Sequence, residues 1–355
     1  MFVTENERQH LLEKYQNRRV FHGQLHDHAA TGGTSDGKIP LSDWVIRMKE
    51  LQLDFAAILD HRQVRHMYLP EWKQALFLCG TEPGTHIPDS HASFNEMHYN
   101  LLVDSPEKLQ ELLLEFPEYA FSGGSEGHFI YPDFSRQRFG ELIDALKAKG
   151  GMFVLPHPKQ YMQSEDPLDY WYRDWTGMEV FYQRRYETID NPYTQSNYIL
   201  WRELLRLGKR IWPCAGSDRH RLCTDGALTT VYAEEATNTS LLSHLRAGDF
   251  TCGGIGIRMC VGDTVSGGEC LLAGKRLIIC ISDFHGSLYR KNHTYRVDIY
   301  GGEDCVKSQI FTGIECEGSV WLALDTADVP FYRVELLDAT NGQRIALGSP
   351  IWNQL

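Results

Sequence analysis

The feature that most constrains this chain is an alternation of short β-like runs with amphipathic helical patterns from Val20 to about Thr251. The helical segments repeat apolar residues at helical spacing, and the short runs have the length of buried strands. The expected strands cover residues 20–26, 53–61, 75–82, 97–103, 151–157, 177–182, 211–218 and 227–233. Such alternation indicates an α/β fold with a parallel sheet, open or closed into a barrel, and we expect a barrel.

The pattern changes after about Cys252, where helical periodicity gives way to short alternating runs. These runs lie at 276–284, 294–301, 319–325 and 331–338, separated by turn signals such as GG, TNG and GSP. Strands at this spacing favour a small antiparallel β-sandwich. We therefore expect two domains: a barrel in residues 1–252, with an N-terminal helix at about 4–17, and an all-β sandwich in residues 253–355.

Composition limits the classes of function. The first 19 residues are polar and no run of about 18 apolar residues occurs, which favours a cytoplasmic protein with no membrane contact. The nine cysteines form no C-x-x-C pair and are expected to be reduced thiols rather than zinc ligands. The net charge of -12 argues against a surface for nucleic acid polymers and favours a small substrate.

Metal-capable side chains coincide with the ends of the expected strands. His26 and His28 end the first run, and their spacing places both rings on one face of a strand. Two solvated histidines are the alternative for this pair alone. Further such residues follow later strands: His61, Glu82, His157, Asp218 and His220, with His98 at the start of another. In α/β-barrels these ends converge at one mouth, so the residues should meet.

The motifs in order, HGQLHDH, SDG, DFAAILDH, GTE, MHYNLLV, LPHP and GSDRH, resemble the polymerase and histidinol phosphatase (PHP) domain family over roughly residues 18–252. The resemblance implies a distorted (β/α)7 PHP-type barrel with an appended β-sandwich, and a trinuclear metal site. It implies one metal on His26, His28, Glu82 and Asp218, a second on Glu82, His98 and His157, and a third on Asp36, His61 and His220. Asp36 replaces a histidine of many relatives and makes the third site richer in oxygen ligands.

The donor types agree with this resemblance. Mixed imidazole and carboxylate ligation suits two to three zinc, manganese or iron ions and disfavours calcium. A Glu82 carboxylate that bridges two ions would hold them at the separation used in two-metal hydrolysis, with a bridging hydroxide as nucleophile. We expect a metal-dependent phosphoesterase in which Glu82, Asp218 and His220 are catalytic. A PHP-fold hydrolase of a non-phosphate ester, carbamate or amide is the alternative, and a degenerate binding protein is a third hypothesis.

Basic residues near the expected ligands are candidates for holding a small anionic substrate such as a phosphomonoester or diester of a metabolite. The candidates are Arg62, Lys159, Arg184, Arg185, Arg219 and Arg221. An arginine can grip two phosphate oxygens at once, although any single one of these side chains could equally be a surface charge. The C-terminal strands carry no cluster of metal-capable residues, so we expect a noncatalytic role there, such as homo-oligomer formation.

Overall fold

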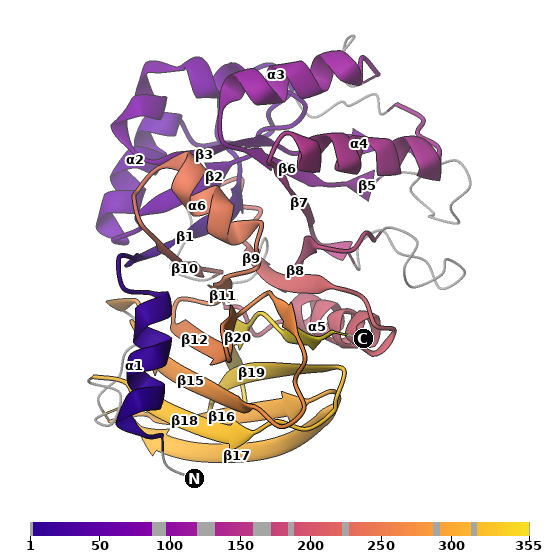
Figure 1. Cartoon of the computed structure of the whole chain (residues 1–355). Coiled ribbons are helices and arrows are strands. Elements are labelled where there is room, and N and C mark those ends of the chain that lie inside the picture. Colours follow the sequence, from indigo (N-terminus) through magenta and orange to yellow (C-terminus); the bar gives the residue numbers. More distant parts are fainter. Residues whose placement is uncertain are drawn as a thin grey trace.

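The structure is a computed structural model. It describes residues 3–86, 97–118, 132–158, 172–183, 188–221, 227–286, 292–313 and 318–354. These residues form a mixed α/β fold, with helices around a sheet in the N-terminal region and strands predominating in the C-terminal region (Figure 1). No helix in the described ranges is long and apolar enough to cross a membrane.

Seven strands of the N-terminal region follow one another across the sheet. They are β1 (Arg19–Asp27), β2 (Phe55–Ile58), β3 (Phe77–Thr81), β6 (Asn100–Val103), β7 (Met152–Leu155), β8 (Thr176–Tyr182) and β9 (Ile211–Gly216). Beyond the last strand the backbone returns to the first: the Asp218 N–H donates to His26 O at 2.7 Å, and the His28 N–H donates to Arg219 O at 2.9 Å. The chain after β9 therefore lies beside the end of β1, which brings residues distant in sequence together.

The sheet is mixed rather than wholly parallel. β1, β2 and β3 pair in parallel, as do β7, β8 and β9, but β6 is antiparallel to both of its neighbours. Between β3 and β6 the described residues hold only the short paired strands β4 (Gly84–Thr85) and β5 (Met97–His98). β6 therefore interrupts the parallel series that the alternation of strands and helices favoured.

Helices form in the amphipathic segments between the expected strands. They are α2 (Leu41–Glu50), α3 (Pro106–Glu115), α4 (Arg136–Ala148), α5 (Pro192–Arg206) and α6 (Asn238–Leu245), with 3-10 turns η1 (Arg65–Tyr68) and η2 (Pro70–Gln74) after β2. Ser105, Ser135, Asn191 and Thr237 cap four of them by accepting backbone N–H bonds. Caps satisfy donors that have no partner within the helix, which explains these starting points.

The C-terminal strands form two layers around their own hydrophobic cluster. One sheet contains β13 (Thr264–Val265), β12 (Gly256–Val261), β15 (Arg276–Ser282) and β18 (Val320–Asp325). The other layer contains β14 (Glu269–Cys270), β16 (Thr294–Gly301), β17 (Asp304–Thr312), β19 (Phe331–Asp338), β20 (Arg344–Gly348) and β21 (Ile351–Asn353). Ile257, Ile279 and Val334 are among the fully buried residues that fill the space between them.

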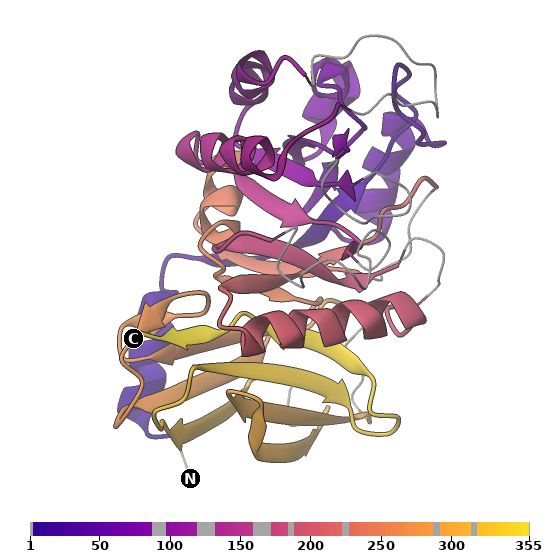
Figure 2. The same cartoon turned by 90° about the vertical axis from the view of Figure 1, so that its right-hand side faces the viewer.

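The sheet of the N-terminal region continues into this second layer. β10 (Thr229–Ala233) pairs antiparallel with β1, β11 (Phe250–Cys252) pairs with β10, and β20 pairs with β11. The run expected at 227–233 thus joins the two regions instead of extending a parallel series. Between them α5 lies along the C-terminal strands (Figure 2), where the Tyr198 hydroxyl donates to Glu335 Oε1 at 2.6 Å. A boundary near residue 252 stays a prediction.

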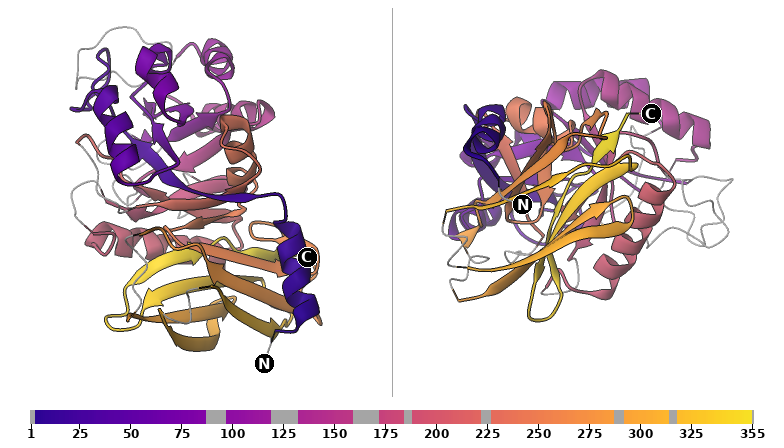
Figure 3. Two further views of the ribbon diagram at one scale, coloured as in Figure 1. Left: turned by 90° about the vertical axis from the view of Figure 1, so that its left-hand side faces the viewer. Right: turned by 60° about the horizontal axis from the view of Figure 1, so that its bottom comes forward.

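The N-terminal helix packs against the C-terminal region. α1 (Glu5–Lys14) lies along the side of these strands (Figure 3), and its Leu11 contacts a cluster that includes Cys260 and Ile278. The His10 ring is 2.8 Å from Gly262 O, through Nε2. We expected this helix to belong to the domain of residues 1–252, because a short amphipathic segment does not reveal which distant residues it packs against.

Candidate metal centre

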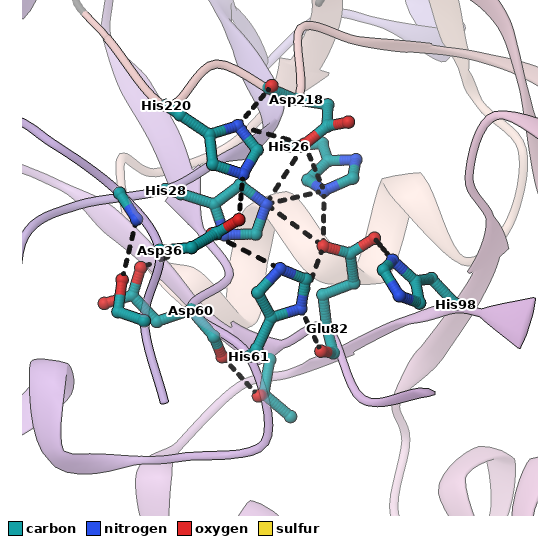
Figure 4. Close-up of polar contacts among 12 residues, drawn as sticks. His26, His28, Asp36, Asp60, His61, Glu82, His98, Asp218 and His220 are labelled. Carbon is teal, nitrogen blue, oxygen red and sulfur yellow. Dashed lines mark hydrogen bonds and ion pairs between the residues drawn. The ribbon is translucent and has the colours of Figure 1, made fainter. Parts of the chain in front are cut away.

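The expected ligands gather where strands of the N-terminal region end (Figure 4). His26 and His28 lie at the end of β1, with their Nε2 atoms 3.3 Å apart, so the predicted shared face is confirmed. Glu82 follows β3 and Asp218 follows β9. His157 and Asp218 have φ values of 30° and 47°, a backbone region that non-glycine residues occupy at a cost.

Glu82 stands at the middle of the cluster, with no exposed surface. Its Oε2 lies 3.1 Å from His26 Nε2 and 3.0 Å from His28 Nε2. Its Oε1 lies 3.1 Å from His98 Nδ1 and 3.2 Å from His157 Nε2. The two carboxylate oxygens therefore face different sets of histidines, which is the geometry a bridging ligand needs.

Three sets of side chains bring their ligand atoms within 4.8 Å of one another. The sets are His26, His28, Glu82 and Asp218; His28, Asp36, His61 and His220; and His61, Glu82 and His98. The first equals the set implied for one metal, and the second contains the set implied for the third metal. The remaining set differs from expectation: among the described residues His61 takes the place expected for His157, which still lies 3.2 Å from Glu82.

Hydrogen bonds show which nitrogen of two rings carries the proton. The His220 Nδ1 lies 3.0 Å from the carbonyl of Asp218, and the His61 Nδ1 lies 3.0 Å from the carbonyl of Glu82. A carbonyl only accepts, so each Nδ1 must donate and each neutral ring has its lone pair on Nε2. Both Nε2 atoms face Asp36, at 2.8 and 3.4 Å. A lone pair and a carboxylate repel each other unless a cation, either a proton or a metal ion, lies between them.

The electrostatics of the centre also favour bound cations. Burial alone would lower the pKa of His28, but the Asp218 and Glu82 carboxylates raise it to about 10. Burial alone would raise the pKa of Glu82, but His26 and His61 are among the rings that hold it well below its usual value. Imidazole and ionised carboxylate are the donors of zinc, manganese and iron sites, so these residues fit divalent transition metals.

Three further residues support the centre and were not among the expected site residues. Glu179 of β8 contacts His26, and the Tyr182 hydroxyl donates to Asp218. Asp60 accepts the Ala29 N–H at 2.8 Å and so braces the loop after β1. A glutamate inside the apolar run GMEVFY was the available signal for Glu179, because buried carboxylates are rare without partners.

The candidate substrate residues divide into two groups. Arg62 is buried with φ at 50°, Arg219 is half-buried and Arg221 is exposed, and all three adjoin ligand residues in the chain. Lys159, Arg184 and Arg185 lie outside the described residues. A role for any of these side chains in substrate binding stays a prediction.

No family model and no curated protein matches the sequence. Among solved structures, the chain is similar to a two-domain protein from Bacteroides vulgatus that contains a predicted PHP-like metal-dependent phosphoesterase. The two sequences are 11% identical and the TM-score is 0.43. The match covers 94% of this chain and 96% of that one. The description of that protein names the family that the sequence motifs resemble.

Two further similar structures match less of the chain. A proposed metal-dependent phosphoesterase from Bifidobacterium adolescentis shows 19% identity and a TM-score of 0.36, over 58% of this chain and 90% of that one. Endonuclease Q, in complex with a 27-mer duplex substrate with an abasic lesion, shows 11% identity and a TM-score of 0.41, over 64% of this chain and 57% of that one. At these values the matches transfer neither a reaction nor a substrate.

The expectation that nucleic acid is excluded is wrong as an exclusion: Endonuclease Q, one of the similar structures, holds a duplex DNA substrate, although this likeness assigns no substrate to the present chain. The expectation rested on the net charge of -12, which is a sum over the whole chain. Charge summed in this way does not determine the potential at a local site, where bound cations can outweigh nearby carboxylates. The overall charge therefore does not exclude a polynucleotide.

Proposed function

We propose that this chain is a metal-dependent phosphoesterase of the PHP type. The proposal includes a distorted (β/α)7 barrel for the N-terminal region and an accessory β-sandwich for the C-terminal region. The observation that carries it is the arrangement around Glu82, where two carboxylate oxygens face separate sets of imidazole nitrogens at 3.0–3.2 Å. Imidazole nitrogens with a lone pair and ionised carboxylate oxygens at these distances form a donor set that divalent cations can share.

The proposed ligand sets are those that the resemblance to the PHP family implies. His26, His28, Glu82 and Asp218 would hold one ion, Glu82, His98 and His157 a second, and Asp36, His61 and His220 a third. Two to three zinc, manganese or iron ions suit these donors. When bound, the ions would polarise a phosphate ester and activate water for attack on phosphorus.

The side chains of the centre have distinct proposed roles. Glu82 would fix the spacing of two ions through its two oxygens. Asp218 would hold an ion through Oδ1, which lies 3.2 Å from His28 Nε2, while its carbonyl fixes the proton of His220 on Nδ1. His220 would then present Nε2 beside Asp36, 2.8 Å from Oδ2. All three thus act by keeping donor atoms at fixed positions.

The charge of the loaded centre supports an anionic substrate. Three divalent ions would outweigh the carboxylates of Asp36, Glu82 and Asp218 and leave a positive site in an acidic protein. Arg62 and Arg219 adjoin this site in the chain and would contact phosphoryl oxygens. A phosphate ester is the substrate class that this charge favours.

Elemental analysis followed by a hydrolysis panel tests the proposal. The panel contains nucleotides, sugar phosphates, cyclic phosphates, a DNA duplex with an abasic site, carboxyl esters, carbamates and amides. We expect two to three transition-metal ions per chain and cleavage of a phosphate ester. Less than one ion per chain after metal reconstitution would overturn the metal centre, and cleavage confined to carbonyl compounds would overturn the phosphoesterase assignment.

The third ligand set separates phosphoryl from carbonyl chemistry. Charge accumulates on several phosphoryl oxygens in the transition state, whereas a carbonyl develops one oxyanion. We expect Asp36→Asn and His220→Ala to reduce phosphoesterase turnover about 10²-fold or more, the scale for loss of one preorganised charge-stabilising group. Any carbonyl ester hydrolysis should fall less. The occupancy of the other two sites, measured in the same samples, is the control.

A further inference from the structure

Glu179 forms hydrogen bonds with two of the expected ligand residues through atoms that do not face Glu82. It lies on β8 with 1% of its surface exposed, and neither of its carboxylate oxygens belongs to the ligand sets described above. Oε1 is 2.7 Å from Nδ1 of His26, and Oε2 accepts the backbone N–H of His157 at 2.8 Å. One buried carboxylate thus contacts a ligand from β1 and another that follows β7.

The contact with His26 determines which ring nitrogen can bind a metal. An ionised carboxylate only accepts hydrogen bonds, so Nδ1 of His26 must carry the proton. The lone pair then lies on Nε2, the atom that faces Glu82 Oε2 at 3.1 Å. In metal sites, a carboxylate that accepts from the non-ligating nitrogen of an imidazole fixes the orientation of the ring and increases the basicity of the ligand.

The contact with His157 acts on the backbone. His157 has φ at 30°, which a residue with a Cβ adopts only when its surroundings impose it. The bond to Glu179 Oε2 satisfies the N–H of this residue inside the protein, where an unpaired donor would be costly. The strained backbone that aims the His157 ring at Glu82 is therefore held by Glu179.

The neighbouring strand leaves room for this carboxylate. Gly216 ends β9, and a Cβ added there would overlap Oε1 of Glu179. The pairing of β8 with β9 also shifts register between Glu179 and Phe181, which sets the local position of the glutamate. Glycine at position 216 and the register shift both accommodate a charged group that an apolar strand would otherwise exclude.

We propose that Glu179 is a positioning residue of the metal centre. It sets the tautomer and orientation of His26 and holds the backbone of His157, and through both it raises the affinity of the centre for divalent metal. This inference rests on the proposed metal site, but it concerns affinity and geometry rather than the substrate.

Glu179→Gln tests the proposal with little change of shape. Both partners of Glu179 are donors, and a glutamine can accept from only one of them through its single amide oxygen. Either the His157 N–H loses its acceptor, or His26 moves its proton to Nε2 and loses its lone pair toward the metal. We expect the affinity for Zn²⁺, measured by chelator competition on metal-free protein, to fall 10–100-fold, the usual effect of such a change.

Two measurements distinguish positioning from general destabilisation. Long-range ¹H–¹⁵N spectra of the zinc-loaded protein should show the His26 proton on Nδ1 in the wild type and an altered signal in Glu179→Gln. Tyr198→Phe is the matched control, because it removes a buried hydrogen bond to Glu335 far along the chain from the ligands. It should lower Tm without changing zinc affinity.

Other variants keep the proposal testable if Glu179→Gln does not fold. Glu179→Asp retains two accepting oxygens and should restore part of the affinity, while Gly216→Ala should lower affinity with Glu179 still present. Wild-type affinity in folded Glu179→Gln, or in both Gly216→Ala and Glu179→Asp, would overturn the proposal. If the wild type binds zinc but hydrolyses no ester, the proposed function fails and this test still decides the role of Glu179.

Discussion

The hydroxyl of Tyr182 donates a hydrogen bond to Oδ2 of Asp218 at 2.8 Å. The other oxygen of the same carboxylate, Oδ1, lies 3.2 Å from His28 Nε2, on the side of the proposed ions. Tyr182 is buried, and its backbone carbonyl accepts from Asn191 at the start of α5. The phenol is thus held in place and limits rotation of the Asp218 carboxylate, whose Oδ2 also lies 3.8 Å from His157 Nε2.

Tyr182→Phe should weaken metal binding without unfolding the protein. A hydrogen bond to a charged acceptor contributes about 1.5–3 kcal/mol, and its loss frees the Asp218 carboxylate to rotate. We expect a roughly 10-fold or greater loss of zinc affinity, measured by chelator competition. Tyr15→Phe is the matched control, because Tyr15 is also buried and donates to a carboxylate, Asp249, at 2.9 Å. Equal affinity in Tyr182→Phe and the wild type would contradict this role for Tyr182.

Glu82→Ala should remove more metal than Asp36→Ala. Glu82 faces histidines of two proposed ion positions through separate oxygens, whereas Asp36 contacts His61 and His220. Elemental analysis after gel filtration should therefore show loss of at least two ions in Glu82→Ala and of one in Asp36→Ala. The same metal content in both variants would contradict the assignment of Glu82 as a bridge.

Acid should destabilise the metal-free protein partly through His22. Burial and the nearby charge of His285 lower the pKa of His22 to about 4, from a usual 6.5. Its Nδ1 lies 3.0 Å from the Thr230 hydroxyl, and Asp283 opposes the shift only weakly. The unfolded chain therefore binds a proton that the folded chain does not. The contribution of neutral His22 to stability is complete above pH 6.5 and is lost as the pH falls toward 4.

Chemical denaturation of the wild type and His22→Asn at pH 7 and pH 4.5 measures this contribution. The shift corresponds to about 3 kcal/mol over its full range, at about 1.4 kcal/mol per pKa unit. Asparagine can still donate to Thr230 but takes up no proton in this range. We expect the free energy of unfolding to fall less with acid in His22→Asn than in the wild type. Parallel losses in the two proteins would show that His22 has no part in the acid response.

Truncation after Cys252 should leave an unstable fragment. Phe331, Leu347 and Trp352 pack in the same hydrophobic cluster as the N-terminal strands, and β20 pairs with β11 at Thr251. Full burial of each such side chain contributes about 1.5–3 kcal/mol, a large share of a typical stability of about 5–15 kcal/mol. We expect the fragment 1–252 to aggregate or to lack a cooperative thermal transition in circular dichroism. A soluble fragment with the wild-type Tm would show that the regions fold independently.

Local patterns in the sequence predict several of the side chains that the structure brings together. The two-residue spacing of His26 and His28 determines a shared face in any strand, and the positions of Glu82 and Asp218 after strands follow from the alternation. The assignment of ligand residues to the individual ion positions was less predictable. His61 approaches Glu82 through the course of its loop, and no spacing rule specifies that course.

Long-range packing was the part that sequence patterns could not predict. Glu179 could face either side of its strand, and its partners come from β1 and from the residues after β7. β6 pairs antiparallel with β3, a strand direction that apolar periodicity does not report. The continuous sheet through β10 and β11 likewise depends on pairing partners rather than on local propensity.

The position of α1 has a consequence for how the protein is made. His10 and its partner Gly262 are separated by 252 residues, so the helix leaves the ribosome long before the strands that cover it. Synthesis at about 5–20 residues per second delays that contact by tens of seconds. During this interval Leu11 of α1 lacks its contacts with the cluster that includes Cys260 and Ile278. This helix is therefore among the last elements to dock, and chaperones have time to engage it before those strands are made.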